Sequence, residues 1–295
     1  MRNLRRTMLF IPGNNPGMLQ NAGILGADSI ILDLEDAVSL DEKDSARILV
    51  RNAIKTVDYS GCELVVRVNP LDTPFGYDDV NTIARVKPDA LLLAKATEKG
   101  MKSVDELLTK IEKEEGFEEG SIKLIPLIET AYGLENIYSI ISSSKRSIAV
   151  LLGAEDLTAD LGIKRTKEGE EIAYARSKTA AACKALRVDA IDTPFTDTND
   201  PEGLAKDTAR AKSVGMSGKA AINPRQVDVI HQVFAPTEAE ITYALRVLEA
   251  KDKAFKEGKG VFSLDGKMVD APIIARANAT LEKARLSGLL QGREA

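Results

Sequence analysis

Short apolar runs recur along the chain, and several of them stop abruptly at a charged residue. Clear examples are residues 64–66, 124–128 and 150–154. A run that is apolar on both faces is typical of a strand buried in a parallel sheet, and parallel α/β folds place their sites at the carboxyl ends of such strands. The first candidates for functional residues are therefore the charges that follow these runs, Arg67, Glu129 and Asp156.

Candidate strands alternate with stretches of helical periodicity. There are eight, at residues 7–11, 29–34, 63–68, 90–94, 123–128, 148–152, 188–191 and 218–222. Such alternation predicts βαβ units, and eight of them favour an α/β fold of the closed (β/α)8 TIM barrel type over an open doubly wound sheet. A Rossmann fold fits less well, because the first turn, Pro12-Gly13-Asn14-Asn15-Pro16-Gly17, lacks the G-x-G-x-x-G spacing.

The chain leaves the barrel pattern after residue 236. Thr237 and Glu240 form a capping-box signal that opens a long helix, and Gly258-Lys259-Gly260 breaks it. Asp265-Gly266 between two short apolar stretches predicts a two-residue hairpin, and Pro272 opens a last helix.

We therefore expect two parts. Residues 1–236 form the barrel and its catalytic site, and residues 237–295 form a C-terminal extension of helix, hairpin and helix. The extension is too small to hold a core of its own, so we expect it to pack on the barrel or on a neighbouring subunit.

Composition and charge narrow the class of protein. The 295 residues are 44% hydrophobic, enough to bury a substantial core. The net charge is −5 and the basic residues are dispersed, which offers no field for nucleic acid or anionic lipid. No segment approaches the roughly 20 apolar residues that span a bilayer, and the first residues lack a signal-peptide core. We expect a cytoplasmic protein that binds neither nucleic acid nor membrane.

Cysteine and histidine usage excludes several kinds of site. Cys62 and Cys183 lack ligand spacing and are interpreted as packing residues. Ser-His-Asp, Cys-His and multi-histidine metal sites would all depend on His231, the only histidine in the sequence. It lies in a predicted helix over residues 224–233, and we interpret it as a surface or packing residue.

In a closed barrel, the third, fifth and sixth strands bring Arg67, Glu129 and Asp156 to one rim. Two carboxylates without histidine or thiolate suit a hard cation such as Mg²⁺, with Mn²⁺ as its substitute. Arg67 has the geometry to hold a substrate carboxylate bidentately. Each residue alone is equally typical of an ion pair at the rim, but together they favour a site. Glu155 should point away from Asp156 in an extended segment, in a structural role.

Other polar residues lie at the same predicted rim. Asp33, Glu35 and Asp36 end the second strand as a cluster, and Glu35 or Asp36 is expected to hold metal-bound water or Arg67. Asn14 lies in the first loop, which either receives a phosphate or pantetheine arm or is a plain turn. Lys95 ends the fourth strand, and we interpret it as a substrate-binding or rim-pairing residue. A Schiff-base role for Lys95 is the weaker alternative, because the carboxylate pair favours a metal.

Seven segments in order span nearly the whole chain. They are Leu9-Phe10-Ile11-Pro12-Gly13-Asn14, Leu32-Asp33-Leu34-Glu35-Asp36-Ala37-Val38, Val66-Arg67-Val68-Asn69, Pro126-Leu127-Ile128-Glu129-Thr130, Gly153-Ala154-Glu155-Asp156-Leu157, Gly218-Lys219-Ala220-Ala221-Ile222-Asn223-Pro224-Arg225-Gln226 and Leu264-Asp265-Gly266-Lys267-Met268-Val269-Asp270-Ala271-Pro272. Together they resemble the malyl-CoA/citryl-CoA lyase (HpcH/HpaI aldolase) family of metal-dependent barrels. Asn223, where many relatives have histidine, and the complete tail resemble its citrate lyase β-subunit branch.

The resemblance implies that Glu129 and Asp156 bind Mg²⁺ and that Arg67 and Glu129 bind substrate. The implied reaction cleaves a citryl thioester, on acyl carrier protein or coenzyme A, into oxaloacetate and an acetyl thioester, without a nucleotide redox cofactor. The implied partners are α and γ citrate lyase subunits and further copies of the chain, in a trimer or hexamer. A stand-alone malyl-CoA or citramalyl-CoA lyase is the alternative within the family, and a non-catalytic assembly subunit is the alternative outside the enzymes.

The three strand-end charges include no obvious proton-transfer group, and with a single histidine a carboxylate is expected to fill that role. Asp270 is the leading candidate as a catalytic residue, because the hairpin and Pro272 hold it at a defined turn. Related lyases also place an equivalent tail aspartate over a neighbouring subunit's pocket. Asp270 is equally typical of a helix N-cap, so both roles stay open.

Overall fold

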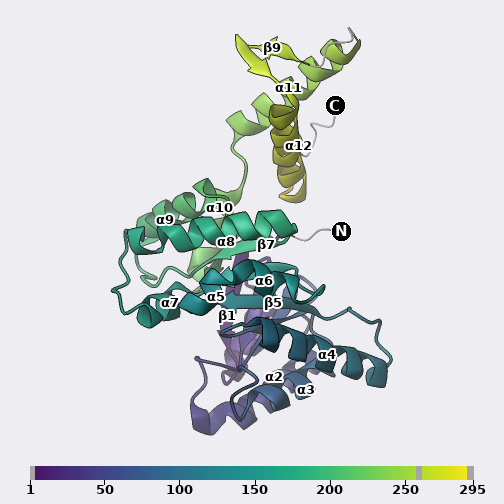
Figure 1. The fold of residues 1–295 in the computed structure, drawn as a ribbon, viewed down its shortest axis with the longest axis vertical. Helices are drawn as coiled ribbons and strands as arrows, with labels where there is room; N and C mark the ends of the chain where they lie inside the picture. Colours follow the sequence, from purple (N-terminus) through teal and green to yellow (C-terminus); the bar gives the residue numbers. More distant parts are fainter. Residues whose placement is uncertain (1–3, 257–260, 291–295) are drawn as a thin grey trace. The chain divides into compact units, whose positions relative to one another are not determined.

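The computed structural model describes residues 4–256 and 261–290. The chain forms two compact units, Met1–His231 and Gln232–Ala295. In Figure 1 the first unit runs from purple to green along the sequence and the second from light green to yellow. No helix in the described parts of the chain is long and apolar enough to cross a membrane.

Within the described residues, eight parallel strands close into a barrel in chain order. They are β1 (Thr7–Pro12), β2 (Ser29–Asp33), β3 (Glu63–Val68), β4 (Ala90–Leu93), β5 (Lys123–Ile128), β6 (Ala149–Leu152), β7 (Asp189–Asp192) and β8 (Gly218–Ala221). Closure comes from the pairing of β1 with β8, in which Met8 lies opposite Ala220. The predicted (β/α)8 barrel is confirmed, and the strand ends agree with the predicted ones to within one residue.

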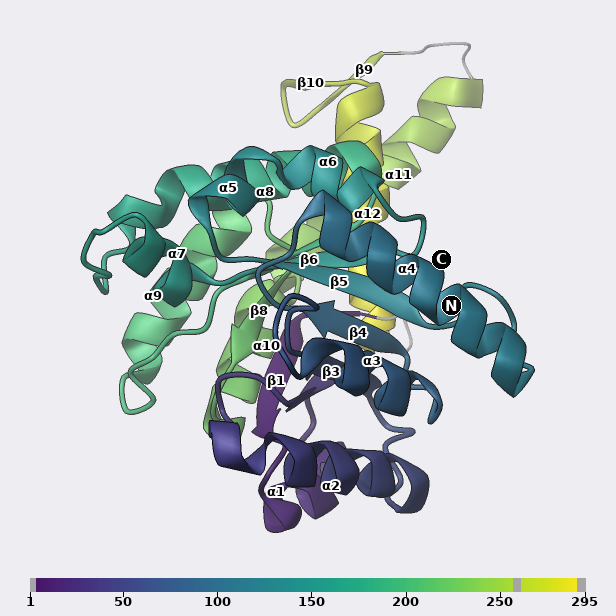
Figure 2. The same ribbon diagram turned by 60° about the horizontal axis from the view of Figure 1, so that its bottom comes forward.

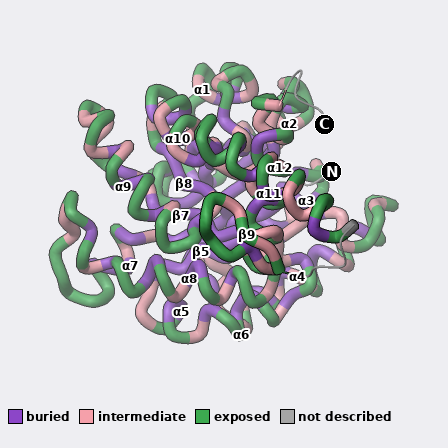
Figure 3. The backbone as a smooth tube through the Cα atoms, turned by 90° about the horizontal axis from the view of Figure 1, so that it is seen from above, coloured by how far each residue is buried: buried purple, intermediate pink, exposed green. Residues whose placement is uncertain are grey.

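The strands are apolar on both faces because helices cover the outside and side chains fill the inside. Figure 2 shows the helices of the first unit around its strands, and Figure 3 shows the strands buried and the outer turns of the helices exposed. The cluster that fills the barrel includes Met8, Ile31, Val65, Leu92, Ile125, Leu127, Leu151 and Ile191.

The helices of the first unit follow the strands in alternation. They are α1 (Pro16–Asn21), α2 (Lys43–Thr56), α3 (Gly76–Ala84), α4 (Glu98–Glu115), α5 (Ala131–Glu135), α6 (Ile137–Ser142), α7 (Ala154–Asp160), α8 (Ala173–Leu186), α9 (Pro201–Ser213) and α10 (Val227–Phe234), the last crossing into the second unit. In α4 the sequence itself explains where the helix starts, which face is buried and where it ends. The Thr97 side chain caps its start, Met101, Val104 and Leu108 form its buried stripe, and Gly116 ends it with φ 70°.

A buried network of ionised side chains joins β7 and β8 to the helices behind them. The Lys219 Nζ lies 2.6 Å from both Asp192 Oδ2 and Asp207 Oδ2. The Arg176 guanidinium donates to the same two carboxylates at 2.7–2.9 Å. Two cations thus balance two anions in a region with almost no solvent access.

His231 contacts the amino end of β1, at the end of the barrel opposite the strand-end charges. Its Nε2 lies 2.8 Å from the Thr7 Oγ1. Burial lowers the pKa of His231, although Asp28 opposes this shift. The histidine therefore has the packing role expected for it.

The second unit contains α11 (Glu238–Lys256), β9 (Phe262–Leu264), β10 (Lys267–Val269) and α12 (Ala271–Leu286). The predicted capping box is present, since the Thr237 N–H donates to Glu240 Oε2 at 2.7 Å and the Glu240 N–H to Thr237 Oγ1 at 3.2 Å. The predicted hairpin turns at Asp265 and Gly266, both with positive φ as a two-residue turn requires. The helix, hairpin and helix are confirmed, while the predicted break at residues 258–260 lies outside the described residues.

The second unit also has a small apolar cluster, which the sequence did not predict. The cluster consists of Ala244, Val247, Val269 and Ala277, with larger side chains packed against it. It forms because α11 and α12 turn their apolar faces toward one another and toward the hairpin. The packing of this unit on a barrel stays a prediction.

Candidate active site

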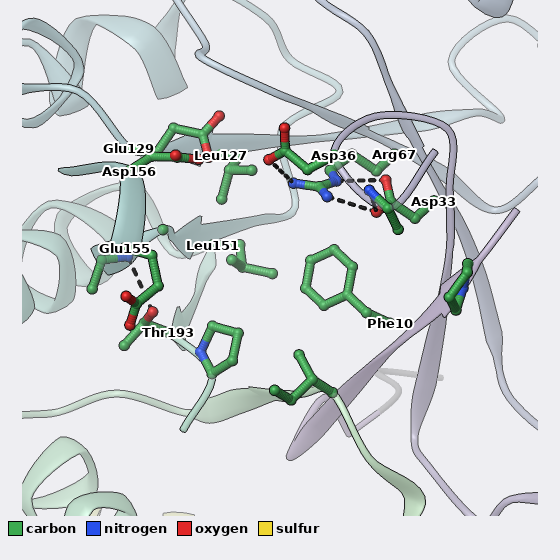
Figure 4. Close-up of a pocket in the computed structure, with 16 residues that line it drawn as sticks. Phe10, Asp33, Asp36, Arg67, Leu127, Glu129, Leu151, Glu155, Asp156 and Thr193 are labelled. Carbon is green, nitrogen blue, oxygen red and sulfur yellow. Dashed lines mark hydrogen bonds and ion pairs between the residues drawn. The ribbon is translucent and has the colours of Figure 1, made fainter. Parts of the chain in front are cut away.

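The carboxyl ends of the barrel strands enclose a cavity of about 400 Å³. Figure 4 shows Glu129 and Asp156 beside one another on one wall, and Arg67 with Asp33 and Asp36 on another. The cavity floor is apolar, with Phe10, Leu127 and Leu151. The structure therefore brings all three strand-end charges to one cavity.

Glu129 follows β5 directly, and its side chain is almost fully buried. Its Oε1 accepts a hydrogen bond of 2.6 Å from the backbone N–H of Lys95. Lys95 has φ 47°, an uncommon conformation for a residue with a side chain, which the surrounding structure must hold in place. Burial raises the pKa of Glu129 to about 9, the Lys95 N–H opposes this rise, and the charges of Glu35 and Asp156 add to it.

Asp156 lies in the first turn of α7. The expectation of an extended segment is wrong here, because β6 ends at Leu152 and the helix starts at Ala154. Acidic residues in a first helical turn interact favourably with the helix dipole. Glu155 is exposed, lines the cavity mouth and lies 3.5 Å from the Arg165 Nε.

The charge around the cavity is strongly negative. Among the described residues, its lining has the carboxylates of Asp33, Asp36, Glu129, Glu155 and Asp156 against a single guanidinium, that of Arg67. Within residues 4–256 and 261–290, neither Glu129 nor Asp156 forms an ion pair with a basic side chain. Their mutual repulsion is relieved by a proton or by a cation, and the donors are hard oxygens. The pair therefore fits Mg²⁺ or Mn²⁺.

The two carboxylates do not make a closed metal cage. No group of three or more His, Cys, Asp or Glu side chains in the described residues is arranged to hold a metal. Mg²⁺ commonly takes one or two protein carboxylates and completes its octahedron with water and substrate oxygens.

Arg67 is surrounded by carboxylates. Its Nε and Nη2 donate to the two oxygens of Asp33 at 2.7 and 2.6 Å. Its Nη1 lies 2.9 Å from Glu35 Oε2 and 3.5 Å from Asp36 Oδ2, and its guanidinium lies 5.0 Å from the centre of the Phe10 ring. Burial lowers the pKa of Arg67, but its bonds to Asp33 and the nearby charges raise it overall. The bidentate edge that the sequence assigned to substrate therefore belongs to Asp33 in this structure.

Glu35 lies behind the cavity wall, where its carboxylate pairs with Arg67. Burial raises the pKa of Glu35 and the Arg67 charge partly offsets this rise. The backbone around Glu35 is held by the buried Lys43. Its Nζ donates to the carbonyls of Leu34 and Glu35 and to Asn69 Oδ1 at 2.6–2.9 Å. Glu35 and Asp36 thus both contact Arg67, one of the two contacts expected for them.

Asn14 and Lys95 do not line this cavity. Asn14 donates from Nδ2 to Glu42 Oε2 at 2.8 Å and is not among the lining residues. The half-exposed Lys95 side chain lies 3.9 Å from Glu35 Oε1 and lines a neighbouring cavity of about 320 Å³. Asp270 belongs to the second unit, where its carboxylate caps α12 by accepting from the Ile273 N–H at 3.4 Å.

Two residues of the site were given no role of their own by the sequence. Asp33 is the main partner of Arg67, and the two residues are paired in register at the ends of β2 and β3. That position at neighbouring strand ends was the signal that could have predicted the pair. Thr193 lines the cavity after β7, and nothing in its local sequence distinguishes it.

Residues 6–224 match the family described as HpcH/HpaI aldolase/citrate lyase. The chain is 45% identical over 288 residues to the citrate lyase subunit beta of Leuconostoc mesenteroides subsp. cremoris, covering 97% of this chain and 95% of that protein. It is 34% identical over 302 residues to the L-malyl-CoA/beta-methylmalyl-CoA lyase of Cereibacter sphaeroides, covering 95% of each. Among solved structures, it is similar to protein CitE from Mycobacterium tuberculosis in complex with magnesium, acetoacetate and coenzyme A. That similarity has a TM-score of 0.81 and 28% identity, and covers 97% of this chain and 100% of that one.

Proposed function

Because this chain belongs to the HpcH/HpaI aldolase/citrate lyase family, we propose that it is a Mg²⁺-dependent carbon–carbon lyase that cleaves a citryl thioester into oxaloacetate and an acetyl thioester. The carrier is acyl carrier protein or coenzyme A. The observation that carries the proposal is the pair of carboxylates of Glu129 and Asp156, which lie beside Arg67 in one cavity and form no ion pair with a basic side chain of the described residues. The choice of substrate is supported by the 45% sequence identity to a citrate lyase subunit beta, which extends over 97% of this chain.

Glu129 and Asp156 are the proposed metal ligands. When bound, Mg²⁺ supplies Lewis-acid stabilisation for the oxygen on which negative charge develops. The Lys95 N–H holds one oxygen of Glu129 at 2.6 Å, and the Glu129 side chain also interacts with that of Asp156. Glu129 would therefore hold the metal together with Asp156, and we propose that it also contacts the substrate.

Arg67 is proposed to bind a substrate carboxylate through Nη1. The contact of Nη1 with Asp36 is the longest around the guanidinium, at 3.5 Å, and the Asp36 side chain is 58% exposed. A substrate carboxylate can replace Asp36 while the bidentate Asp33 pair keeps the guanidinium plane fixed. Lys95 and Asn14 are proposed to contact outer parts of the substrate, and Glu35 to support Arg67 from behind.

The proposal is tested by oxaloacetate release from citryl-CoA and from the citryl carrier protein, followed by coupled reduction of the product. We expect activity with Mg²⁺ or Mn²⁺ and none with excess chelator. Cleavage of malyl-CoA but not of either citryl thioester would overturn the substrate assignment. Absence of both metal binding and cleavage would indicate a non-catalytic assembly subunit.

A malyl-CoA lyase is the second candidate function. The observation that favours it is the 34% identity to an L-malyl-CoA/beta-methylmalyl-CoA lyase with 95% coverage of both chains. A side-by-side measurement of kcat/KM on citryl-CoA, malyl-CoA and citramalyl-CoA separates the two functions.

Asp270 is proposed as the catalytic proton-transfer group, acting on the cavity of a neighbouring copy. We expect Asp270→Asn to lower kcat about 10²–10⁴-fold, because an amide cannot exchange the proton. The fold of the Asp270→Asn protein should be unchanged, since asparagine caps a helix as well as aspartate does. The measurement is kcat together with a thermal melt.

Asp265→Asn is the matched control, because Asp265 lies at the hairpin turn of the same unit with φ 51°, which asparagine tolerates. We expect wild-type turnover for this variant. Full turnover of Asp270→Asn would exclude Asp270 from proton transfer.

The proposal extends to the assembly. We propose that the protein acts in the cytoplasm as a homo-oligomer, a trimer or hexamer, together with α and γ subunits that handle the carrier. Light scattering on the purified chain measures the first part, and copurification with tagged chain tests the second.

A further inference from the structure

α7, the helix that presents Asp156, begins without a capping side chain of its own. Gly153 occupies the N-cap position. A Cβ there would lie 2.8 Å from the Glu129 Cβ and 2.9 Å from Glu129 Oε2, closer than side chains can approach. Glycine therefore lets Glu129 lie against the start of the helix, but it provides no acceptor for the first backbone N–H groups.

Thr193, the residue that follows β7, supplies an acceptor from elsewhere in the chain. Its Oγ1 accepts a hydrogen bond of 3.0 Å from the Ala154 N–H, drawn as a dashed line in Figure 4. Thr193 has no solvent exposure and is 39 positions away from Ala154 in the sequence. Because the bond is buried, its loss leaves a desolvated N–H without a partner in the metal-free protein.

The backbone that carries Thr193 is firmly held. Asp192, the preceding residue, accepts from Arg176 and from Lys219 in the buried network behind β7 and β8. Thr193 thus connects a rigid part of the barrel to the first turn of α7. The opposite ligand, Glu129, is held independently by the Lys95 N–H.

We propose that Thr193 is a positioning residue for the metal site: by capping Ala154 it sets where the Asp156 carboxylate lies relative to Glu129. The inference rests on the proposed metal site. Asp156 is two residues after Ala154, so a small shift of the helix start moves its carboxylate by a similar amount. Metal–ligand distances stay within about ±0.2 Å of their usual values. Mutation of a residue that holds a ligand in place typically lowers metal affinity about 10–100-fold.

The test is Mn²⁺ affinity without substrate, measured from the electron paramagnetic resonance signal of the free ion. Thr193→Val keeps nearly the same shape and removes the oxygen, and we expect it to weaken Mn²⁺ binding about 10–100-fold. Thr193→Ser keeps the oxygen and should bind within about threefold of the wild type. Added Mg²⁺ should restore much of the lost turnover of Thr193→Val.

Thr208→Val is the matched control. Thr208 is equally buried, and its hydroxyl donates to the Leu204 carbonyl within α9, away from the cavity. We expect wild-type Mn²⁺ affinity for this variant. If Thr193→Val does not fold, Thr193→Ala replaces it in the same comparison.

Two results would overturn the inference: a Thr193→Val protein that binds Mn²⁺ like the wild type, or a Thr193→Ser protein weakened as much as Thr193→Val. A wild-type protein that binds no Mn²⁺ would instead overturn the metal site on which the inference rests. The two failures are therefore distinguishable.

Discussion

Glu129→Gln is expected to reduce cleavage of the citryl thioester about 10³-fold while making the metal-free protein more stable above neutral pH. The loss follows because an amide is a poorer ligand for a hard cation, and a bound ion contributes several kcal/mol of transition-state stabilisation. The gain follows because the same substitution removes a buried carboxyl that has to ionise beside Asp156.

The sign of the stability change follows from the pKa of Glu129. Burial raises this pKa from 4.5 to about 9. Between these values the folded protein holds a proton that the unfolded chain has released, so the free energy of unfolding falls as pH rises through this window. The stabilising contribution is complete below about pH 4.5 and lost above about pH 9.

Glutamine removes this pH dependence. In chelator at pH 8, Glu129→Gln should therefore melt above the wild type, with about 2–4 °C for each kcal/mol gained. At pH 4.5 the two proteins should melt alike. Added Mg²⁺ should reverse the order at pH 8, since only the wild type binds it tightly.

Glu119→Gln is the matched control, because Glu119 is exposed in the loop between α4 and β5. It should change neither turnover nor the melting temperature. A Glu129→Gln protein that keeps wild-type turnover with Mg²⁺ would contradict the assignment of Glu129 as a metal ligand.

Lys219→Met is expected to have the largest effect on folding, lowering the free energy of unfolding by about 3–5 kcal/mol. The Lys219 side chain is completely buried and donates to Asp192 and Asp207 at 2.6 Å each. Without it, Arg176 alone faces two buried carboxylates, and one negative charge is left without compensation. Urea unfolding with a fitted midpoint and slope measures the change.

Two further variants identify the cause. Lys102→Met replaces an exposed lysine of α4 and should change stability by no more than about 0.5 kcal/mol. Adding Asp207→Asn to Lys219→Met restores the charge balance and should recover part of the loss. If Lys219→Met unfolds within about 1 kcal/mol of the wild type, the network is not an important source of stability.

The candidate site shows where sequence reasoning succeeds. Arg67, Glu129 and Asp156 each end or follow an apolar run, and a closed parallel barrel places such ends at one rim. The strands, the capping box at Thr237 and the hairpin turn at Asp265 were also predictable, because each depends on residues within a few positions of one another.

It also shows where sequence reasoning fails. The sequence predicts an extended segment at Glu155 and Asp156, whereas α7 already starts at Ala154. There the Thr193 hydroxyl, just after β7, accepts a hydrogen bond from the Ala154 N–H, 39 positions away in the sequence. Likewise Arg67 was expected to be free for substrate, whereas Asp33 holds its bidentate edge.

By itself, the sequence determined the barrel, the extension that follows it, the family resemblance and the strand ends at which chemistry is expected. Only the tertiary structure decided how the side chains at those ends are paired. Asp33 meets Arg67 across 34 positions, Lys95 meets Glu129 across 34, and Ala154 meets Thr193 across 39. The physical reason is that apolar periodicity and turn residues act locally. Hydrogen bonds between neighbouring strand ends depend on register, barrel closure and burial, which no local pattern contains.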